Sequence, residues 1–183
     1  TVIKKVQNEN IEPYKEQTIN EPLVATPPAP GKIVKTERDA DMEATIWTLS
    51  NGIKVILKNT NFKDDEILMT ASALGGYSKF AEKDPVNCKV MNSVMNLGGV
   101  GKFSATDLPK VLAGKTASAS PSVSLTTQDI NGSSSIKDFE TMMQLVYLYF
   151  TAPRRDEDAF KSFMQRTETQ LKNQEAEPMV AFS

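Results

Sequence analysis

The chain has no histidine among its 183 residues, and this absence excludes several common kinds of enzyme site. Without imidazole there is no H-x-x-E-H zinc helix, in which two histidines on one helix face bind the metal and the glutamate activates water. A serine or cysteine nucleophile also lacks its usual base. We therefore predict that this chain contributes no catalytic residue and no metal ligand.

Cysteine, excess charge and long apolar runs are scarce as well. Cys88 is the only cysteine, so an internal disulfide and a cysteine-based zinc site are both excluded. We interpret it as a small apolar residue on a buried helix face. The 21 basic and 23 acidic residues nearly balance, which favours neither nucleic acid nor an anionic membrane as a partner. No apolar run approaches the roughly 20 residues that cross a bilayer, so we expect no membrane span.

The glycine-rich run at residues 98–102 does not match a phosphate-binding loop. The pattern G-x-x-x-x-G-K-[ST] requires glycine where Asn96 stands and a hydroxyl residue where Phe103 stands. The run also follows a predicted helix, whereas a dinucleotide fingerprint follows a strand. We interpret it as a flexible connection between two helices.

The first part of the chain is rich in proline and has no sustained helix or strand period. Half of the ten prolines lie in residues 1–35, and the run at 28–31 contains two of them with a glycine. Such a composition predicts an extended, semi-rigid linker, here residues 1–42, with a disordered tail as the alternative. A few apolar residues predict partial docking of this segment on a folded surface: Ile11, Tyr14, Leu23 and Val24.

Residues 43–183 predict an α+β fold. Runs rich in apolar and β-branched residues predict strands at 46–49, 53–58, 66–74, 116–125 and 127–132. The Asn51-Gly52 pair predicts a hairpin between the first two strands. Apolar residues at helical spacing predict helices at 85–97, 107–113, 135–152 and 156–174. This order indicates an antiparallel sheet with helices packed on one face.

Apolar periodicity also predicts which faces are buried. In the second strand, Ile53, Val55 and Leu57 share one face and are expected to be covered. In the long third helix the predicted core stripe is Ile136, Phe139, Met142, Met143, Val146 and Phe150. In the last helix it is Phe160, Phe163, Met164 and Leu171.

Three segments, in order, resemble the insulinase/pitrilysin family of zinc metallopeptidases. Residues 47–55 (WTLSNGIKV) are similar to the opening hairpin of that family. Residues 97–115 and 138–154 resemble the non-catalytic, C-terminal half of bacterial members built from two halves. The proline-rich start resembles the linker that joins those halves. The family fold is α+β, as the periodicity predicts, and the family's domain continues through a further strand, so we expect this one to be truncated at its C-terminus.

This resemblance implies a function that the residues alone do not show. The helix at 85–97 corresponds to the family's zinc helix but offers only Asn87, Asn92 and Asn96 where ligands would be sought. The resemblance therefore implies an inactive domain that helps to enclose a chamber and hold peptide or unfolded-protein substrates. Zinc and catalysis would belong to a separate, histidine-bearing N-terminal half of the same polypeptide, which as a whole would be a metalloendopeptidase of the periplasm or cell envelope.

The family binds substrate as an added strand, which requires a lightly encumbered sheet edge. The candidate is the small-residue run Ala117, Ser118, Ala119 and Ser120, with an ordinary strand packed under small side chains as the alternative. Two other functions remain open: a scaffold related to the family with no peptidase activity in any half, and an independent peptide-binding module.

Overall fold

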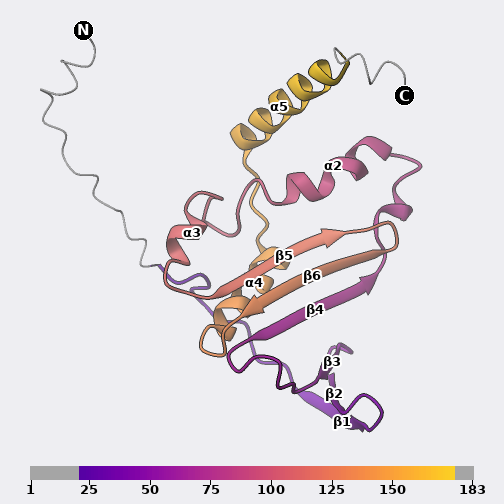
Figure 1. Cartoon of the computed structure of the whole chain (residues 1–183), viewed down its shortest axis with the longest axis vertical. Coiled ribbons are helices and arrows are strands. Elements are labelled where there is room, and N and C mark those ends of the chain that lie inside the picture. Colours follow the sequence, from indigo (N-terminus) through magenta and orange to yellow (C-terminus); the bar gives the residue numbers. More distant parts are fainter. Residues whose placement is uncertain (1–20, 176–183) are drawn as a thin grey trace, which may run out of the picture.

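The computed structural model describes residues 21–175 and divides its strands between two antiparallel sheets (Figure 1). The small sheet has the order β1-β2-β3, with β1 (Ile33–Asp39), β2 (Ala44–Leu49) and β3 (Lys54–Leu57). The predicted hairpin is confirmed, and Gly52 takes the positive φ of 87° that its turn requires. Strand β1 lies within the predicted linker and was missed, because its run of alternating charges carries no apolar period.

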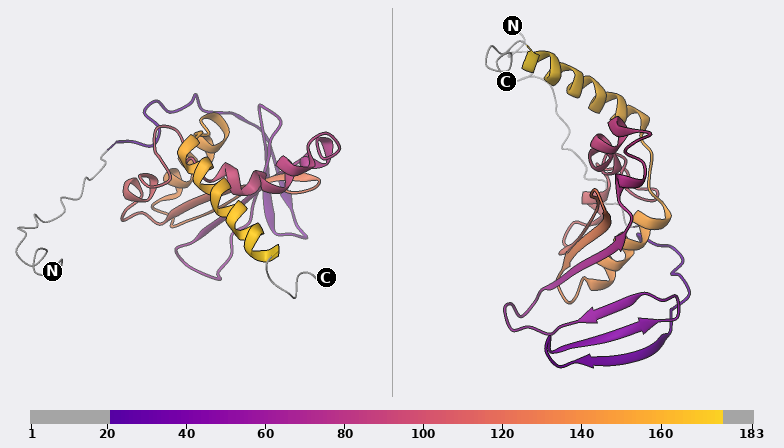
Figure 2. Two further views of the ribbon diagram at one scale, coloured as in Figure 1. Left: turned by 90° about the horizontal axis from the view of Figure 1, so that it is seen from above. Right: turned by 90° about the vertical axis from the view of Figure 1, so that its right-hand side faces the viewer.

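The main sheet has the order β4-β6-β5, with β4 (Ile67–Leu74), β5 (Ala117–Val123) and β6 (Thr127–Ser134). Helix α4 (Phe139–Thr151) lies across one face of this sheet, so the predicted α+β class is confirmed. The strands form two sheets where we expected one. Figure 2 shows the small sheet at one end of the molecule and helix α5 (Glu157–Glu175) at the other.

Two shorter helices and a 3-10 turn connect β4 to β5. They are the turn η1 (Tyr77–Lys79), α2 (Pro85–Met95) and α3 (Leu108–Val111). Helix α2 begins as predicted, because Pro85 needs no hydrogen bond in the first turn and the Asp84 carboxylate accepts the backbone N–H of Asn87 at 3.3 Å. None of the helices in residues 21–175 is both long and apolar enough to cross a membrane.

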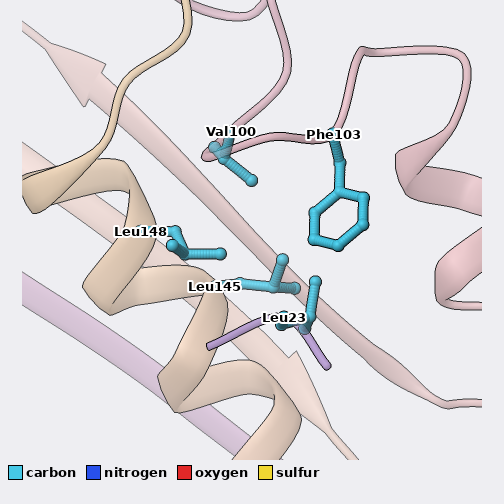
Figure 3. Close-up of a cluster of buried hydrophobic side chains, with 5 residues drawn as sticks. All are labelled: Leu23, Val100, Phe103, Leu145 and Leu148. Atoms are coloured by element: carbon cyan, nitrogen blue, oxygen red, sulfur yellow. The ribbon is translucent and has the colours of Figure 1, made fainter. Parts of the chain in front are cut away.

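The core lies between α4 and the glycine-rich loop. Leu23, Val100, Phe103, Leu145 and Leu148 point toward one another there (Figure 3). Docking of the proline-rich segment is thus confirmed for Leu23, which is 8% exposed, while Ile11 and Tyr14 lie outside the described residues. The Lys102 ammonium also pairs with the Glu21 carboxylate beside this cluster.

The glycine-rich loop is close packed, contrary to its interpretation as a flexible connection. A Cβ added to Gly98 would lie 1.8 Å from the carbonyl oxygen of Arg154, and Val100 is fully buried. The Gly101 N–H donates to the Ala152 carbonyl at 2.7 Å. These glycines let the loop approach the end of α4 at backbone distance.

The predicted core stripe of α4 is largely wrong. Met142 is buried, but Ile136 is 62% and Phe150 is 72% exposed, and the helix buries Thr141, Leu145 and Leu148 instead. The helix begins at Phe139, with Asp138 as its N-cap, four residues later than the predicted start at Ser135. Because α4 is apolar around most of its circumference, periodicity alone could not select the face that meets the sheet.

Burial was also overestimated in α5 and in β3. Phe160, Met164 and Leu171 are 43%, 48% and 55% exposed, and Phe163 is half-buried. Ile53 and Leu57 of the hairpin are 55% and 40% exposed. An amphipathic pattern identifies an apolar face but not the element that covers it, and within the described residues these faces are largely open to solvent.

Candidate functional site: the outer edge of strand β5

Strand β5 forms one edge of the main sheet. Its hydrogen-bonded neighbour is β6, with Ala117 opposite Ser134, Ala119 opposite Gly132 and Val123 opposite Gln128. The four residues that the sequence singled out, Ala117, Ser118, Ala119 and Ser120, are the first four of this edge strand. The structure therefore places them on one of the two edges of the main sheet, the other being β4.

The register shows which backbone groups face outward. The Ser124 N–H donates to the Thr127 carbonyl at 2.8 Å, and the Ser135 N–H donates to the Thr116 carbonyl at 2.9 Å. Because inward and outward residues alternate in an antiparallel pair, Ala117, Ala119, Pro121 and Val123 direct their backbone groups away from β6. Pro121 has no N–H to lose on that side, as expected for proline in an edge strand.

The side chains of β5 divide between a helix-covered face and an open one. Ala117 and Ala119 are half-buried, and Ala119 packs against the core cluster beneath α4. Ser118 and Ser120 are exposed on the opposite face. The two alanines of this strand thus pack on the helix-covered side of the sheet, while the two serines lie in solvent on the other side.

The open face of the main sheet is lined by polar side chains. The Thr70 hydroxyl donates to the Asn131 side chain at 3.0 Å, and the Ser72 hydroxyl donates to the Asp129 carboxylate at 2.5 Å. The Ser72 hydroxyl, followed by that of Thr127, holds the pKa of Asp129 below its ordinary value. Hydroxyl and carboxylate groups thus make the middle of this face polar, whereas Leu68 and Leu74, on the same face of β4, are 73% and 89% exposed.

Asp138 anchors the start of β5. Its carboxylate accepts the Thr116 N–H at 2.8 Å and the Ser135 hydroxyl at 2.9 Å. The Thr116 N–H, followed by the Ser135 hydroxyl, lowers the pKa of this carboxyl from its ordinary 3.8. Sequence analysis placed Asp138 within the predicted helix 135–152 and gave no signal that it anchors a strand 22 residues away.

Asn92 of α2 closes the other end of β5. Its side-chain amide donates to the Val123 carbonyl at 2.9 Å and accepts the Val123 N–H at 2.8 Å. Sequence reasoning placed Asn92 on the polar face of its helix and missed this contact. The two residues are 31 positions apart, and no local pattern connects them.

Comparison with known proteins places this geometry in context. No family model matches the chain. All of it aligns, at 30% identity, with 17% of a protein from Arabidopsis thaliana described as a zinc protease PQQL-like. Its fold matches the periplasmic protease PqqL from Escherichia coli with a TM-score of 0.77 and 23% identity, over 98% of this chain and 20% of that one. The ferredoxin protease FusC, solved as a variant in complex with Arabidopsis ferredoxin, matches with a TM-score of 0.74 and 21% identity, over 96% of this chain and 20% of that one.

This chain is similar in sequence to part of a zinc protease-like protein, and it shares the α+β fold of PqqL and FusC. It spans about a fifth of the length of these relatives. The α+β fold predicted from the sequence is therefore confirmed, and the similarity to a zinc protease-like protein agrees with the resemblance stated from the sequence.

The residues present do not fit the zinc that such proteases use. On α2 the Asn87 amide donates to Asp84 at 2.7 Å, Asn92 holds Val123, and the Asn96 amide donates to the Asn92 carbonyl at 3.2 Å. All three asparagines thus make structural hydrogen bonds. Within residues 21–175 no cluster of three or more histidine, cysteine or acidic side chains is placed to hold a metal.

Proposed function

We propose that this chain is a non-catalytic domain of a zinc metalloendopeptidase, which helps to enclose the chamber and holds peptide substrate for a separate catalytic half. One observation carries the proposal: all of the chain aligns with part of a zinc protease-like protein, yet it contains no histidine with which to build the zinc site. Catalysis and zinc then belong to the histidine-bearing N-terminal half of the same polypeptide.

Two features of the main sheet support a role in holding substrate. The edge of β5 presents outward backbone groups at Ala117 and Ala119, and extended peptides bind sheet edges by main-chain pairing. The open face beside it combines polar groups with the exposed side chains of Leu68 and Leu74, which suits a chamber wall in contact with water and unfolded chain. PqqL is described as periplasmic, and we assign this domain to the periplasm or cell envelope by that likeness.

A peptidase assay tests the proposal. An unstructured fluorogenic peptide is incubated with three samples: this chain, the whole protease that carries it, and the whole protease with a zinc chelator. We expect cleavage by the whole protease alone, because the catalytic half supplies the zinc site. Zinc-dependent cleavage by this chain would contradict the proposal. Absence of cleavage by the folded whole protease would favour the alternative of a scaffold without peptidase activity.

A further inference from the structure

The contact between Asn92 and β5 reproduces strand pairing with a side chain. A primary amide carries the same donor and acceptor as a peptide group. At Val123 it makes both bonds that a neighbouring antiparallel residue would make, at 2.8 and 2.9 Å. At Val123 the outer edge of β5 is therefore already hydrogen-bonded to an amide group. The backbone amides of an extended peptide could form the same pair of hydrogen bonds further along this edge.

The rest of that edge has no such partner. Moving away from Val123, the next outward residues are Pro121, Ala119 and Ala117. Among residues 21–175, no helix, loop or side chain is hydrogen-bonded to the outward N–H and C=O groups of the two alanines. The unpaired stretch is thus bounded at Val123 by Asn92. At the other end it is bounded by Lys115, the next outward residue, whose N–H donates to the Leu112 carbonyl at 3.0 Å.

We propose that Asn92 sets the end of a short peptide-binding edge on β5. This proposal rests on the proposed function, because it specifies the ligand of the same edge. An extended peptide pairs with Ala117 and Ala119 and with the Pro121 carbonyl, and it stops where the Asn92 amide occupies Val123. At about 3.3 Å per residue, a segment of roughly five residues covers the distance from Ala117 to Pro121.

Binding of a nested series of peptides tests this limit. Fluorescein-labelled peptides of alternating valine and lysine, four to nine residues long, are titrated against the 183-residue chain and followed by fluorescence anisotropy. In the wild type, affinity rises with length up to about five residues and then levels off. In Asn92→Ala, which vacates both groups of Val123, affinity continues to rise up to about seven residues and the longest peptides gain about three- to tenfold.

The matched control is Asn96→Ala, which makes the same chemical change on the same helix. Asn96 donates to its own helix at the Asn92 carbonyl and makes no hydrogen bond to β5, so this variant keeps the wild-type profile. A second control uses two sets of peptides, N-methylated either at the odd or at the even positions. Because only every second peptide N–H points toward β5 in a paired strand, one set loses binding and the other keeps it.

The rate of backbone amide hydrogen exchange in the wild-type chain tests the same proposal without any substitution. Saturating five-residue peptide slows exchange of the Ala117 and Ala119 amides, while the Val123 amide, already bonded to Asn92, keeps its rate. Peptide binding with identical length profiles in the wild type and in Asn92→Ala would overturn the role of Asn92 and leave edge binding intact. Failure of every peptide to bind the folded chain would overturn both this inference and the proposed peptide-holding role.

Discussion

The two sheets of this domain differ in how far a helix covers their apolar side chains, although each has exceptions: Ala44 of the small sheet is 1% exposed and Leu68 of the main sheet is 73% exposed. In the main sheet, Ile130 of β6 is 2% exposed beneath α4, and Ser134 is 1% exposed. In the small sheet, the apolar residues Ile33, Val34 and Ile56 are 49%, 64% and 59% exposed. Both sheets have three antiparallel strands, so strand formation does not account for the difference.

What differs is the covering element. Helix α4 lies on the main sheet so closely that a Cβ on Gly132 would be 2.8 Å from the Met142 sulfur. The helices of the described residues pack against the main sheet rather than the small one. The residue pattern of a strand therefore predicts that it pairs with other strands. How much a side chain in the sheet contributes to the free energy of unfolding should depend on whether a helix covers it. The following predictions test that contrast, from the largest expected effect to the smallest.

Truncating the side chain that joins α4 to the main sheet should have the largest effect. Met142 is fully buried, so Met142→Ala is expected to lower the free energy of unfolding by about 2–5 kcal/mol through lost burial and a cavity. Ile56→Ala in the small sheet is the matched control, with an expected loss of under about 0.5 kcal/mol. Urea denaturation followed by circular dichroism measures both. Equal losses would show that the small sheet is covered in solution.

Leu23 tests whether the proline-rich segment belongs to the covered core. Leu23→Ala is expected to cost about 2 kcal/mol, the low end for a buried leucine, because the side chain lies at the margin of its cluster. Ile33→Ala, only ten residues further along, should cost much less because Ile33 is half exposed. The same denaturation experiment measures both. A negligible effect at Leu23 would mean that this segment is detached in solution.

Gly98 tests the close approach of the glycine-rich loop to the end of α4. Gly98→Ala drives a methyl group into the Arg154 carbonyl and is expected to cost about 1–3 kcal/mol. Gly31→Ala is the control, because nothing lies within 4 Å of its added Cβ. Thermal unfolding of the two variants provides the comparison. A Gly98→Ala protein as stable as Gly31→Ala would contradict the packing of this loop.

Asp138 predicts a pH dependence localised at the start of β5. Its pKa is lowered in the folded chain by the Thr116 N–H and the Ser135 hydroxyl. A lowered folded pKa stabilises the fold above the unfolded value near 4, and this stabilisation is lost as the pH falls through the folded pKa. Unfolding followed from pH 7 to pH 2 should therefore show a steeper loss below about pH 4 in the wild type than in Asp138→Asn. Parallel curves would show that Asp138 does not contribute.

Local chemistry was sufficient to predict many elements of the fold. The Asn51-Gly52 hairpin, the start of α2 at Pro85 and the strands β4, β5 and β6 were all predicted, because turn, cap and pattern signals act over a few residues. The absence of histidine likewise excluded a histidine-based zinc site without any structure. The small residues of β5 were predicted to form a strand, and they do.

Only the tertiary structure decided where those elements meet. It divided the strands between two sheets, selected the Met142 face of α4, and placed Ala117 and Ala119 on an edge strand whose Val123 is hydrogen-bonded to Asn92. These outcomes depend on contacts between residues tens of positions apart, whose energies no local pattern contains. The sequence by itself thus determined most helices and strands and the absence of a histidine-based zinc site. Long-range packing determined which face of α4 is buried and which strands form the edges of the main sheet.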